Sequence, residues 1–396
     1  MTTGATDSFD VVVTGSGPAG SAAAVTARRL GLSVALVDRA AFPRDKLCGG
    51  GVTGRAAREM LATFGQPVTP DLFRSTGRVR FAARGHELGR IEDAPPLHMT
   101  MRRDFDAMLH RHALAAGAVP VLPARPAAID ETGAALQLTD GRCLRYGVLI
   151  GADGVNSAVA RHLFGRAFDP ATVGFALEIE APAPADDLIE IDLDVPRSGY
   201  AWAFPKHGSL TLGVGGLQRD NADMKALLAG YVARHGLAEG AAGCKGAFLP
   251  AGDFRKVPGR GAVLLAGDAA GLVDPLTGEG IGHAIASGRM AAQAAARALA
   301  SGSPAAALGH YSAALASLHD ELRFAVRLQR LFISGWTHRA MLRIIEAQPA
   351  MQRRMMALLA GEIDYADVRR NLPVRLARRA LATVAAALRP AAGRRR

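Results

Sequence analysis

The stretch "FDVVVTGSGPAGSAAAVTARRLGLSVALVD", residues 9–38, decides the fold of this chain. It begins with a short apolar run, passes through a glycine turn into a segment of helical composition that ends at Gly31, and finishes with a second apolar run. Two apolar runs separated by a turn and a helix are typical of a βαβ unit, in which the two strands are parallel. We therefore predict an α/β fold built on a sheet with parallel strands.

Three glycines of the turn, Gly15, Gly17 and Gly20, have the spacing G-x-G-x-x-G. The first permits a tight turn, the second lets the backbone approach a pyrophosphate, and the third allows close packing of the helix on the strand. Asp38 ends the second apolar run, where a carboxylate can accept a hydrogen bond from a ribose hydroxyl. The stretch thus predicts a dinucleotide-binding turn whose helix start faces the phosphates.

Two later stretches favour FAD over NAD as the dinucleotide. They are "LIGADGVNSAVAR" (149–161) and "VLLAGDAAGLVDPLTGEGIGHAIASG" (263–288). Each ends an apolar run with a turn of small residues that contains an aspartate, Asp153 or Asp268. Such an aspartate can hold ribityl or ribose hydroxyls, and the glycine-rich helix start that follows the second can receive a flavin ring edge or the pyrophosphate.

The amino-acid composition limits the classes of protein to which the chain can belong. The chain has 396 residues, of which 49% are apolar, so it can bury a sizeable core. The three cysteines, Cys48, Cys143 and Cys244, are few and far apart, which argues against a disulfide framework and against a zinc site. No metal site is predicted. The N-terminus lacks a signal peptide pattern and no apolar run is long enough to span a bilayer, so we expect a cytoplasmic protein.

The net charge of +11 is concentrated at the C-terminal end. Residues 365–396 hold nine arginines and one acid, Asp367, so this segment carries +8 and the rest of the chain +3. With few aromatic residues and no basic stretch between stacking residues, a nucleic-acid partner is not expected. Leu381, Val384 and Leu388 fall on one helical stripe, which is typical of an amphipathic helix on an anionic membrane surface. A terminal helix packed on the protein body is the alternative.

The pattern of apolar and polar residues changes along the chain. Helices are predicted at 53–65 and 102–117, alternating segments between 173 and 258 indicate an antiparallel sheet, and the chain after 300 is helical throughout. The predicted organisation is an FAD-binding domain in three pieces, a substrate domain in two, and a helical C-terminal region. The FAD-binding pieces are 1–72, 101–172 and 259–300, the substrate pieces are 73–100 and 173–258, and the helical region is 301–396.

Taken together, the ordered motifs resemble those of FAD-dependent oxidoreductases with the para-hydroxybenzoate hydroxylase type of fold, and more narrowly the geranylgeranyl reductase family. The resemblance covers residues 9–290. It rests on the glycine turn with Asp38, on "FPRDKLCGGG" (42–51), on Arg102 in "RRDFD", and on "GADGVNS", "YAWAFP" and "GDAAGLVDPLTGEGI". It implies a Rossmann-like FAD-binding domain, a loop at 43–51 beside the flavin ring, and FAD contacts from Arg102 and Asp268.

The FAD-binding residues predicted from these motifs are Gly15, Gly17, Pro18, Ala19, Gly20, Asp38, Arg39, Arg44, Cys48, Gly49, Gly50, Arg102, Asp153, Gly267, Asp268, Pro275, Gly278, Gly280 and Ile281.

The stretch "YAWAFPKHGSLTLGVGG" (200–216) resembles the Y-x-W-x-F-P motif and following G-x-G that line the isoprenoid pocket in this family. Its aromatic residues alternate, so on a strand they share one face and can form a wall beside a flat ring or a long apolar chain. An ordinary aromatic core strand is the alternative, and members of the family often have Asn where this chain has Leu212. The predicted pocket residues are Tyr200, Trp202, Phe204, Pro205, Gly213 and Gly215.

Cys48 has three possible roles. A metal site would need further ligands nearby, and none stands at ligand spacing. A nucleophile would need a base, which the sequence does not identify, although Arg44 and Lys46 can lower the thiol pKa. The third role is packing, because the glycines after Cys48 let the backbone approach the flavin and a small thiol fits beside them. We favour packing or modulation, and keep Cys48 with Tyr200 and Trp202 as the candidate catalytic residues.

Three other charged or polar positions receive no chemical role in this prediction. Glu279 caps a helix start or lies near the flavin edge, whereas Lys206 and His207 are expected in an exposed turn.

The resemblance implies hydride transfer from reduced FAD to isoprenoid double bonds of a lipid, a quinone side chain or a chlorophyll-type precursor. The alternatives are a flavin monooxygenase or halogenase acting on an aromatic substrate, and a membrane quinone electron-transfer flavoprotein. A halogenase is expected to show W-x-W-x-I-P, and the electron-transfer proteins usually carry a cysteine-rich segment. Without a second dinucleotide fingerprint, either NAD(P)H or reduced ferredoxin can be the electron donor.

Overall fold

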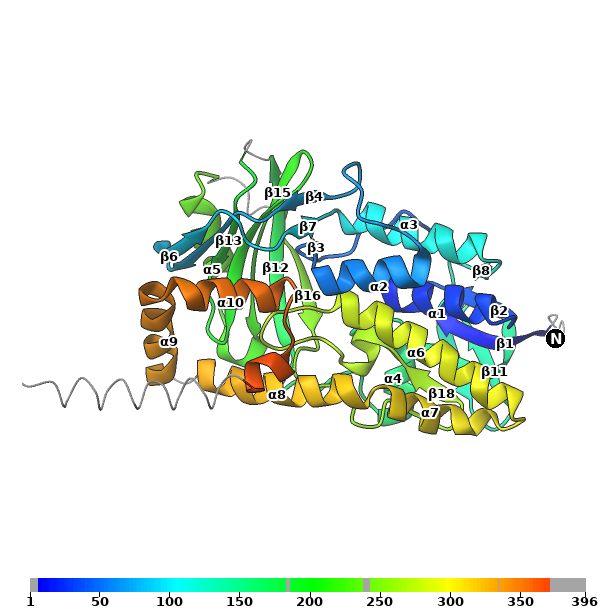
Figure 1. Ribbon diagram of the computed structural model, residues 1–396. Helices are drawn as coiled ribbons and strands as arrows, with labels where there is room; N and C mark the ends of the chain where they lie inside the picture. The colour runs from blue at the N-terminus through cyan, green and yellow to red at the C-terminus, as the bar shows by residue number, and fades with distance from the viewer. Residues whose placement is uncertain (1–5, 183–185, 238–242, 334, 371–396) are drawn as a thin grey trace, which may run out of the picture.

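Two halves of the protein lie side by side, each built on its own sheet (Figure 1). The structure is a computed structural model that describes residues 6–182, 186–237, 243–333 and 335–370. The half that contains the N-terminus carries an eight-stranded sheet, and the other half carries a seven-stranded sheet. A three-stranded sheet lies near the junction of the two halves, and the helices after residue 300 run along both (Figure 1).

The predicted βαβ unit is present at the start of the chain. β1 (Thr6–Thr14) and β2 (Val34–Val37) are parallel neighbours, and α1 (Pro18–Arg29) connects them. The three valines 11–13 and all of β2 are buried. α1 packs against α3 (Arg102–Ala115) and α6 (Ile281–Ala300). Because residues 11–13 and all of β2 are buried whichever face they point to, the two runs of the sequence are apolar without alternation.

The first sheet has the strand order β17-β18-β11-β1-β2-β8, and β10 and β9 continue from β11. Its other strands are β8 (Val119–Val121), β9 (Pro126–Asp130), β10 (Ala135–Leu138), β11 (Cys143–Gly151), β17 (Gly259–Arg260) and β18 (Val263–Leu265). β8, β2, β1, β11 and β18 are parallel, so their carboxyl ends meet at one edge, where Gly15, Asp38, Asp153 and Asp268 follow. This arrangement confirms the α/β, Rossmann-like fold class.

Close contact holds α1 in place at this edge. A Cβ atom on Gly20 would lie 1.7 Å from the carbonyl oxygen of Gly15, and one on Gly288 would lie 2.0 Å from the carbonyl oxygen of Ala19. Neither position can carry a side chain without a shift of the backbone. The first turn of α1 therefore touches both β1 and α6, which fixes the direction of its free amide groups.

The second sheet has the order β16-β12-β15-β14-β13-β5-β6. Its strands are β5 (Val79–Ala83), β6 (His86–Ile91), β12 (Gly174–Pro182), β13 (Ile189–Asp192), β14 (Gly199–Pro205), β15 (Ser209–Leu217) and β16 (Lys245–Leu249). α5 (Met224–Arg234) packs on one face, against β12 and β15. Leu212 is buried on that face, so the position where relatives often have Asn belongs to the core of this half.

One strand pair departs from the predicted antiparallel sheet. β13 runs parallel to β5, with Ile189 opposite Val79, whereas every other neighbouring pair in this sheet is antiparallel. More than a hundred residues separate β5 from β13, and most of them belong to the other half. A hairpin forces antiparallel pairing, but so long an excursion allows the chain to return in either direction.

The remaining elements connect the two halves or cover them. They are β3 (Gly51–Val52), β4 (Arg74–Thr76), β7 (Leu97–Met99), α2 (Gly54–Phe64), α4 (Ala158–Phe164), the 3-10 helices η1 (Gln218–Asp220), η3 (Gly267–Ala270) and η4 (Pro304–Ala306), and α7 (Ala307–Ala314), α8 (Ala316–Ile333), α9 (Gly335–Ala347) and α10 (Pro349–Leu359). β3, β7 and β4 form the small sheet.

The helices after residue 300 match the predicted helical region. α9 and α10 lie against β6, at the outer edge of the second sheet (Figure 1). Within the described part of the chain, no helix combines the length and apolarity that a membrane span needs. Most of the basic segment predicted to be amphipathic, residues 371–396, lies outside the described residues.

The contact between Gly20 and Gly15 yields a stability prediction. We expect Gly20→Ala to lower the free energy of unfolding by about 1–3 kcal/mol, because an added methyl group must displace backbone. Gly230→Ala is the matched control: Gly230 is an exposed residue of α5 with nothing within 4 Å of a Cβ atom. This control should stabilise by about 0.5–1 kcal/mol. Urea unfolding of the two variants measures the difference, and equal midpoints would contradict tight packing at Gly20.

Candidate active site

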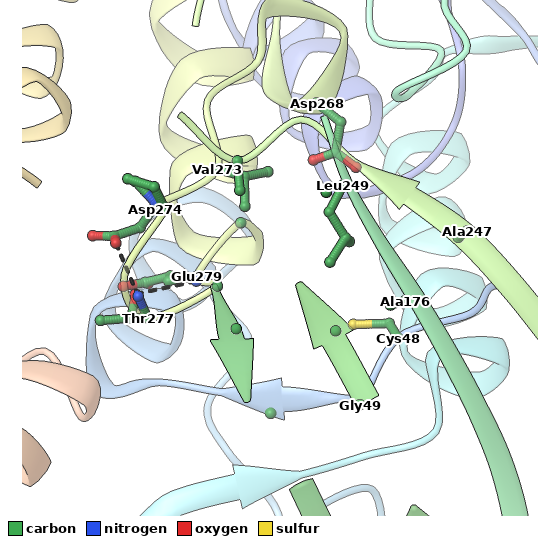
Figure 2. Close-up of a pocket in the computed structure, with 18 of the residues that line it drawn as sticks. Cys48, Gly49, Ala176, Ala247, Leu249, Asp268, Val273, Asp274, Thr277 and Glu279 are labelled. Atoms are coloured by element: carbon green, nitrogen blue, oxygen red, sulfur yellow. Dashed lines mark hydrogen bonds between the residues drawn. The ribbon is translucent and has the colours of Figure 1, made fainter. Parts of the chain in front are cut away.

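A cavity of about 2120 Å³ lies between the two halves and takes its lining from both sheets and from the C-terminal helices. Ligand pockets usually have volumes of roughly 300–1,000 Å³. This cavity therefore has room for a dinucleotide and a second ligand together. Figure 2 shows part of it, with Cys48, Ala176 and Leu249 around one region and Asp274, Thr277 and Glu279 around another.

Most of the predicted site residues line this cavity, although they come from segments far apart in the sequence. From the FAD-binding prediction they are Gly15, Gly17, Pro18, Ala19, Asp38, Arg39, Arg44, Cys48, Gly49, Gly50, Arg102, Asp153, Asp268, Pro275, Gly278, Gly280 and Ile281, and from the pocket prediction Tyr200, Trp202, Phe204 and Gly215.

Four predicted residues lie behind the lining. Gly20 packs on Gly15, and the amide of Gly267 donates to the hydroxyl of Ser287 at 2.9 Å. Pro205 pairs with Leu210 at the end of β14, and Gly213 lies beneath the Trp202 ring. These residues shape the cavity from behind and do not face it.

Two helices begin at the cavity with unused amide groups. Gly17 precedes α1 and Gly280 precedes α6, and neither helix start has a side-chain cap. The first amides of a helix have no intrahelical acceptor and carry partial positive charge. Two such starts in one cavity suit a pyrophosphate and a ring carbonyl of a flavin.

Asp38 and Asp153 lie at the carboxyl ends of β2 and β11. The carboxylate of Asp38 accepts the amides of Ser16 at 2.7 Å and Ala40 at 3.0 Å. Asp153 accepts the amide of Ala158 at 2.7 Å through Oδ2, while its Oδ1 is buried and has no partner among the described residues. Burial raises the pKa of Asp153. A buried oxygen without a partner is costly, so Asp153 fits a ligand hydroxyl such as those of ribose or ribitol.

A buried ion pair stands beside the loop at 43–51. Arg102 donates to Asp106 from Nε at 2.7 Å and from Nη2 at 2.9 Å, and Arg44 lies 3.2 Å from the same carboxylate. Burial by itself opposes the charge, but the carboxylate of Asp106 outweighs it and raises the pKa of Arg102. Two guanidinium groups against one carboxylate leave a positive charge here, which suits an anionic cofactor. Asp106 was missed in the sequence, although its spacing of four from Arg102 on a helix is a usable signal.

Tyr200, Trp202 and Phe204 share one face of β14, which we call the aromatic face. Adjacent ring centroids are 5.8 Å and 6.3 Å apart. The Tyr200 hydroxyl donates to the carbonyl of Thr277 at 3.0 Å. A Cβ atom on Gly49 would lie 2.9 Å from the Phe204 ring, so this glycine lets its loop rest directly on the aromatic face. The predicted approach of these glycines to the flavin ring stays a prediction.

The Cys48 thiol lines the cavity and interacts with the side chain of Arg102. The amide of Gly50 donates to its sulfur at 3.4 Å, and the Cys48 amide donates to Glu178 Oε1 at 2.7 Å. Among the described residues no group of three His, Cys, Asp or Glu side chains can hold a metal ion.

Glu279 lines the cavity and Lys206 differs from expectation. Glu279 is partly exposed, accepts the hydroxyl of Thr53 at 2.7 Å, and has its pKa raised by burial of its carboxyl group. Lys206 is 1% exposed and binds Glu180 at 3.0 Å, so the prediction of an exposed lysine was wrong. The alternation of β14 continues through Lys206, which faces inward toward Gly50. His207 is exposed, as predicted.

One part of the lining comes from helices for which the sequence suggested no role. Apolar side chains of α9 and α10 face the second sheet and extend the cavity away from the nucleotide edge, beyond Tyr200 and Phe204. We call this region the apolar arm. Its residues are Phe81, Leu97, Met99, Ile191, Met341, Leu342, Ile345, Met351, Met355, Leu358 and Leu359. The sequence does contain a signal that could have indicated this binding surface. It is the group of methionines within 341–356, since Met is common at adaptable apolar binding surfaces.

Comparisons with known proteins agree with this geometry. A family model described as FAD dependent oxidoreductase matches residues 10–118. The chain is 34% identical over 313 residues to the menaquinone reductase of Mycobacterium tuberculosis, covering 72% of this chain and 76% of that protein. It is 31% identical over 314 residues to the geranylgeranyl diphosphate reductase of Rhodobacter capsulatus, covering 75% and 77%.

A solved structure has a similar fold. A geranylgeranyl bacteriochlorophyll reductase-like protein from Thermoplasma acidophilum superposes with a TM-score of 0.75 at 22% identity, covering 89% of this chain and 96% of that one. By its fold, its site and its relatives, the chain belongs to the geranylgeranyl reductase family of FAD-dependent oxidoreductases.

Proposed function

We propose that this protein reduces carbon–carbon double bonds of an isoprenoid chain. The observation that carries the proposal is the continuity of one cavity from the nucleotide-binding edge, past the aromatic face, into the apolar arm. A long apolar chain can lie in the arm while one of its double bonds rests between the aromatic face and the cofactor.

The FAD would be held by the residues that line the nucleotide edge. The first amides of α1 face the pyrophosphate position, and Asp38 and Asp153 stand at the strand ends where ribose and ribityl hydroxyls would lie. Bound FAD, once reduced, supplies a hydride. The chain itself binds and orients the substrate and excludes water from the site.

The apolar arm supplies the binding energy for such a substrate. Each methylene or methyl group removed from water contributes about 0.8 kcal/mol. The arm offers Met341, Leu342 and Met355, among others, to a flexible apolar chain. An aromatic substrate that is small and polar would leave most of this surface unused.

The substrate class is narrowed by the names of the relatives. The M. tuberculosis relative is a menaquinone reductase and the R. capsulatus relative is a geranylgeranyl diphosphate reductase. Both names are compatible with a prenyl chain on a polar head. A prenylated quinone and geranylgeranyl diphosphate are therefore the first two substrates to test.

We further propose peripheral membrane contact through residues 365–396. The described part of this segment begins with the buried Tyr365, just after α10. The described residues 365–370 lie beside α10, where Arg354 donates to the carbonyl of Asp367 at 3.2 Å. A prenyl lipid that enters from a membrane would have a short path to the arm.

The function is tested by anaerobic single turnover. Protein reduced with dithionite should be reoxidised by geranylgeranyl diphosphate, with a product heavier by two mass units per double bond reduced, and the fully saturated diphosphate is the control that should leave the flavin reduced. With menaquinone, the product is exposed to air before mass analysis, so that any ring quinol returns to the quinone and only a reduced side chain stays heavier by two mass units. Failure with every prenyl substrate, together with oxygen-dependent hydroxylation or halogenation of an aromatic, would assign the chain to the alternative class.

The apolar arm is tested by narrowing it. Leu342→Trp adds bulk inside the arm, so we expect KM for a geranylgeranyl substrate to rise about tenfold, the equivalent of ~1.4 kcal/mol of lost binding. KM for a substrate with a single prenyl unit should change little. Leu342→Met conserves volume and serves as the control. A rise in KM that is equal for both substrates would place the long chain elsewhere.

Membrane contact is tested by flotation with vesicles of phosphatidylcholine, alone or mixed with phosphatidylglycerol. The full chain should float with the anionic vesicles in low salt and less so in high salt, because screening weakens the attraction of arginine to anionic lipid. A chain that ends at residue 370 should remain in the soluble fraction. Equal flotation of both chains would exclude the C-terminal segment as the membrane contact.

A further inference from the structure

Glu178 of β12 is a buried carboxyl group that uses only one of its oxygens. The residue is 7% exposed and lines the cavity. Its Oε1 accepts the amide of Cys48 at 2.7 Å, whereas its Oε2 is buried without a partner among the described residues. An unpaired charged oxygen in such a place is costly, so the group is either protonated or meets a ligand.

The strand register places Glu178 next to the aromatic face. Glu178 is opposite Gly213 on β15, and Gly213 is opposite Trp202 on β14. Residues opposite one another in a sheet point to the same face. A Cβ atom on Gly213 would lie 2.2 Å from the Trp202 ring, so the indole covers Gly213 and extends from β14 toward β12. The indole Nε1 is also buried without a partner among the described residues. Two unpartnered polar groups thus occupy one row of the sheet.

Burial, rather than the charges around it, shifts Glu178 toward its neutral form. Burial raises the pKa of Glu178, and the carboxylate of Glu180 adds to the effect, while the Cys48 amide, Lys206 and Lys46 act against it. The net shift is upward. Because the Cys48 amide can only donate, Oε1 must be an acceptor, and the proton of the neutral group belongs on Oε2, the oxygen without a protein partner.

Glu180 connects this position to solvent. It lies two residues further along β12, on the same face, and its side chain is 35% exposed. Its Oε1 accepts the hydroxyl of Thr211 at 2.6 Å and pairs with Lys206 at 3.0 Å. The row of carboxyl groups therefore leads from the cavity lining to the protein surface, which is the direction from which a proton can be replaced.

From these contacts we propose that Glu178 donates the proton that completes reduction of the double bond. This inference rests on the proposed function. One alkene carbon accepts hydride from anionic reduced flavin; the O–H bond at Oε2 of Glu178 breaks, and its proton forms a C–H bond on the neighbouring carbon. The alkene gains two electrons, the flavin loses two, and Glu178 is left as a carboxylate that takes a new proton from solvent through the Glu180 side.

The decisive variant is Glu178→Gln. The amide oxygen of glutamine can still accept the Cys48 amide, but glutamine has no acidic proton to transfer. We expect FAD to bind with unchanged affinity and anaerobic reoxidation by a prenyl substrate to slow by about 100-fold or more, the usual contribution of a general acid. Reoxidation by ferricyanide, which takes electrons and needs no proton on carbon, should keep its rate. Glu87→Gln, on β6 of the same sheet and outside the cavity, is the matched control.

Infrared spectroscopy gives a readout that does not depend on turnover. The FAD-bound wild-type protein at neutral pH should show a carboxylic acid C=O band that is lost in Glu178→Gln and retained in Glu87→Gln. The single-turnover rate of the wild type should be high below the pKa of Glu178, which lies above the ordinary 4.5, and fall as pH rises through it. Glu178→Gln should be slow at every pH.

Each of the other outcomes either supports or contradicts the role of Glu178 as proton donor. Wild-type rates in Glu178→Gln, or an unchanged carboxyl band, would overturn the proposal while leaving the proposed function intact. If the wild type reduces no prenyl substrate, the proposed function falls and this role falls with it. Glu178→Asp keeps an acidic proton on a shorter side chain and should recover part of the rate. If Asp and Gln both lose FAD equally, Glu178 is a positioning residue for the loop at 43–51, and the proposal is wrong.

Discussion

The hydrogen bond from the Cys48 amide to Glu178 joins the two halves of this protein at the point where the site must be assembled. Its partners are 130 residues apart in the sequence and 2.7 Å apart in space. Beside it, Gly49 rests on Phe204 at a distance that no side chain would allow. Because the loop at 43–51 follows the first βαβ unit and the aromatic face belongs to the second sheet, this junction sets the distance between the nucleotide edge and the substrate region. A chain bound in the apolar arm would reach the nucleotide edge only if that distance is correct.

The C-terminal helices are attached to the same junction. The amide of Gly54 donates to the carbonyl of Ala360 at 2.7 Å, and Arg58 donates to the carbonyl of Gly361 at the same distance. Arg55 pairs with Glu321 of α8 at 2.9 Å. α2, which begins three residues after Gly51, thus holds both the loop beside the aromatic face and the end of the helix that covers the apolar arm. One helix, α2, thus positions both the end of α10 and the loop at 43–51.

The sequence predicted the features that are local and missed those that arise from distant segments. The glycine turn with Asp38 follows from a short run of residues, because a βαβ unit is defined by its own spacing. The parallel pairing of β13 with β5 and the burial of Lys206 could not be read in this way, since each depends on a partner more than twenty residues away. The apolar arm is the largest omission. Its helices show an ordinary amphipathic pattern, and only the second sheet opposite them turns that pattern into a binding surface.

Two carboxyl groups of the cavity lining each have one buried oxygen without a partner among the described residues. Asp153 and Glu178 each bind one backbone amide, of Ala158 or Cys48, and each leaves a buried oxygen to the cavity. Burial raises the pKa of both. A buried carboxylate with one hydrogen bond is poorly stabilised, so the folded protein shifts each group toward its neutral form. Under the proposed function, the spare oxygen of Asp153 would meet cofactor hydroxyls and that of Glu178 would face the substrate. One physical cost, the burial of an unpaired oxygen, would then underlie both proposed roles.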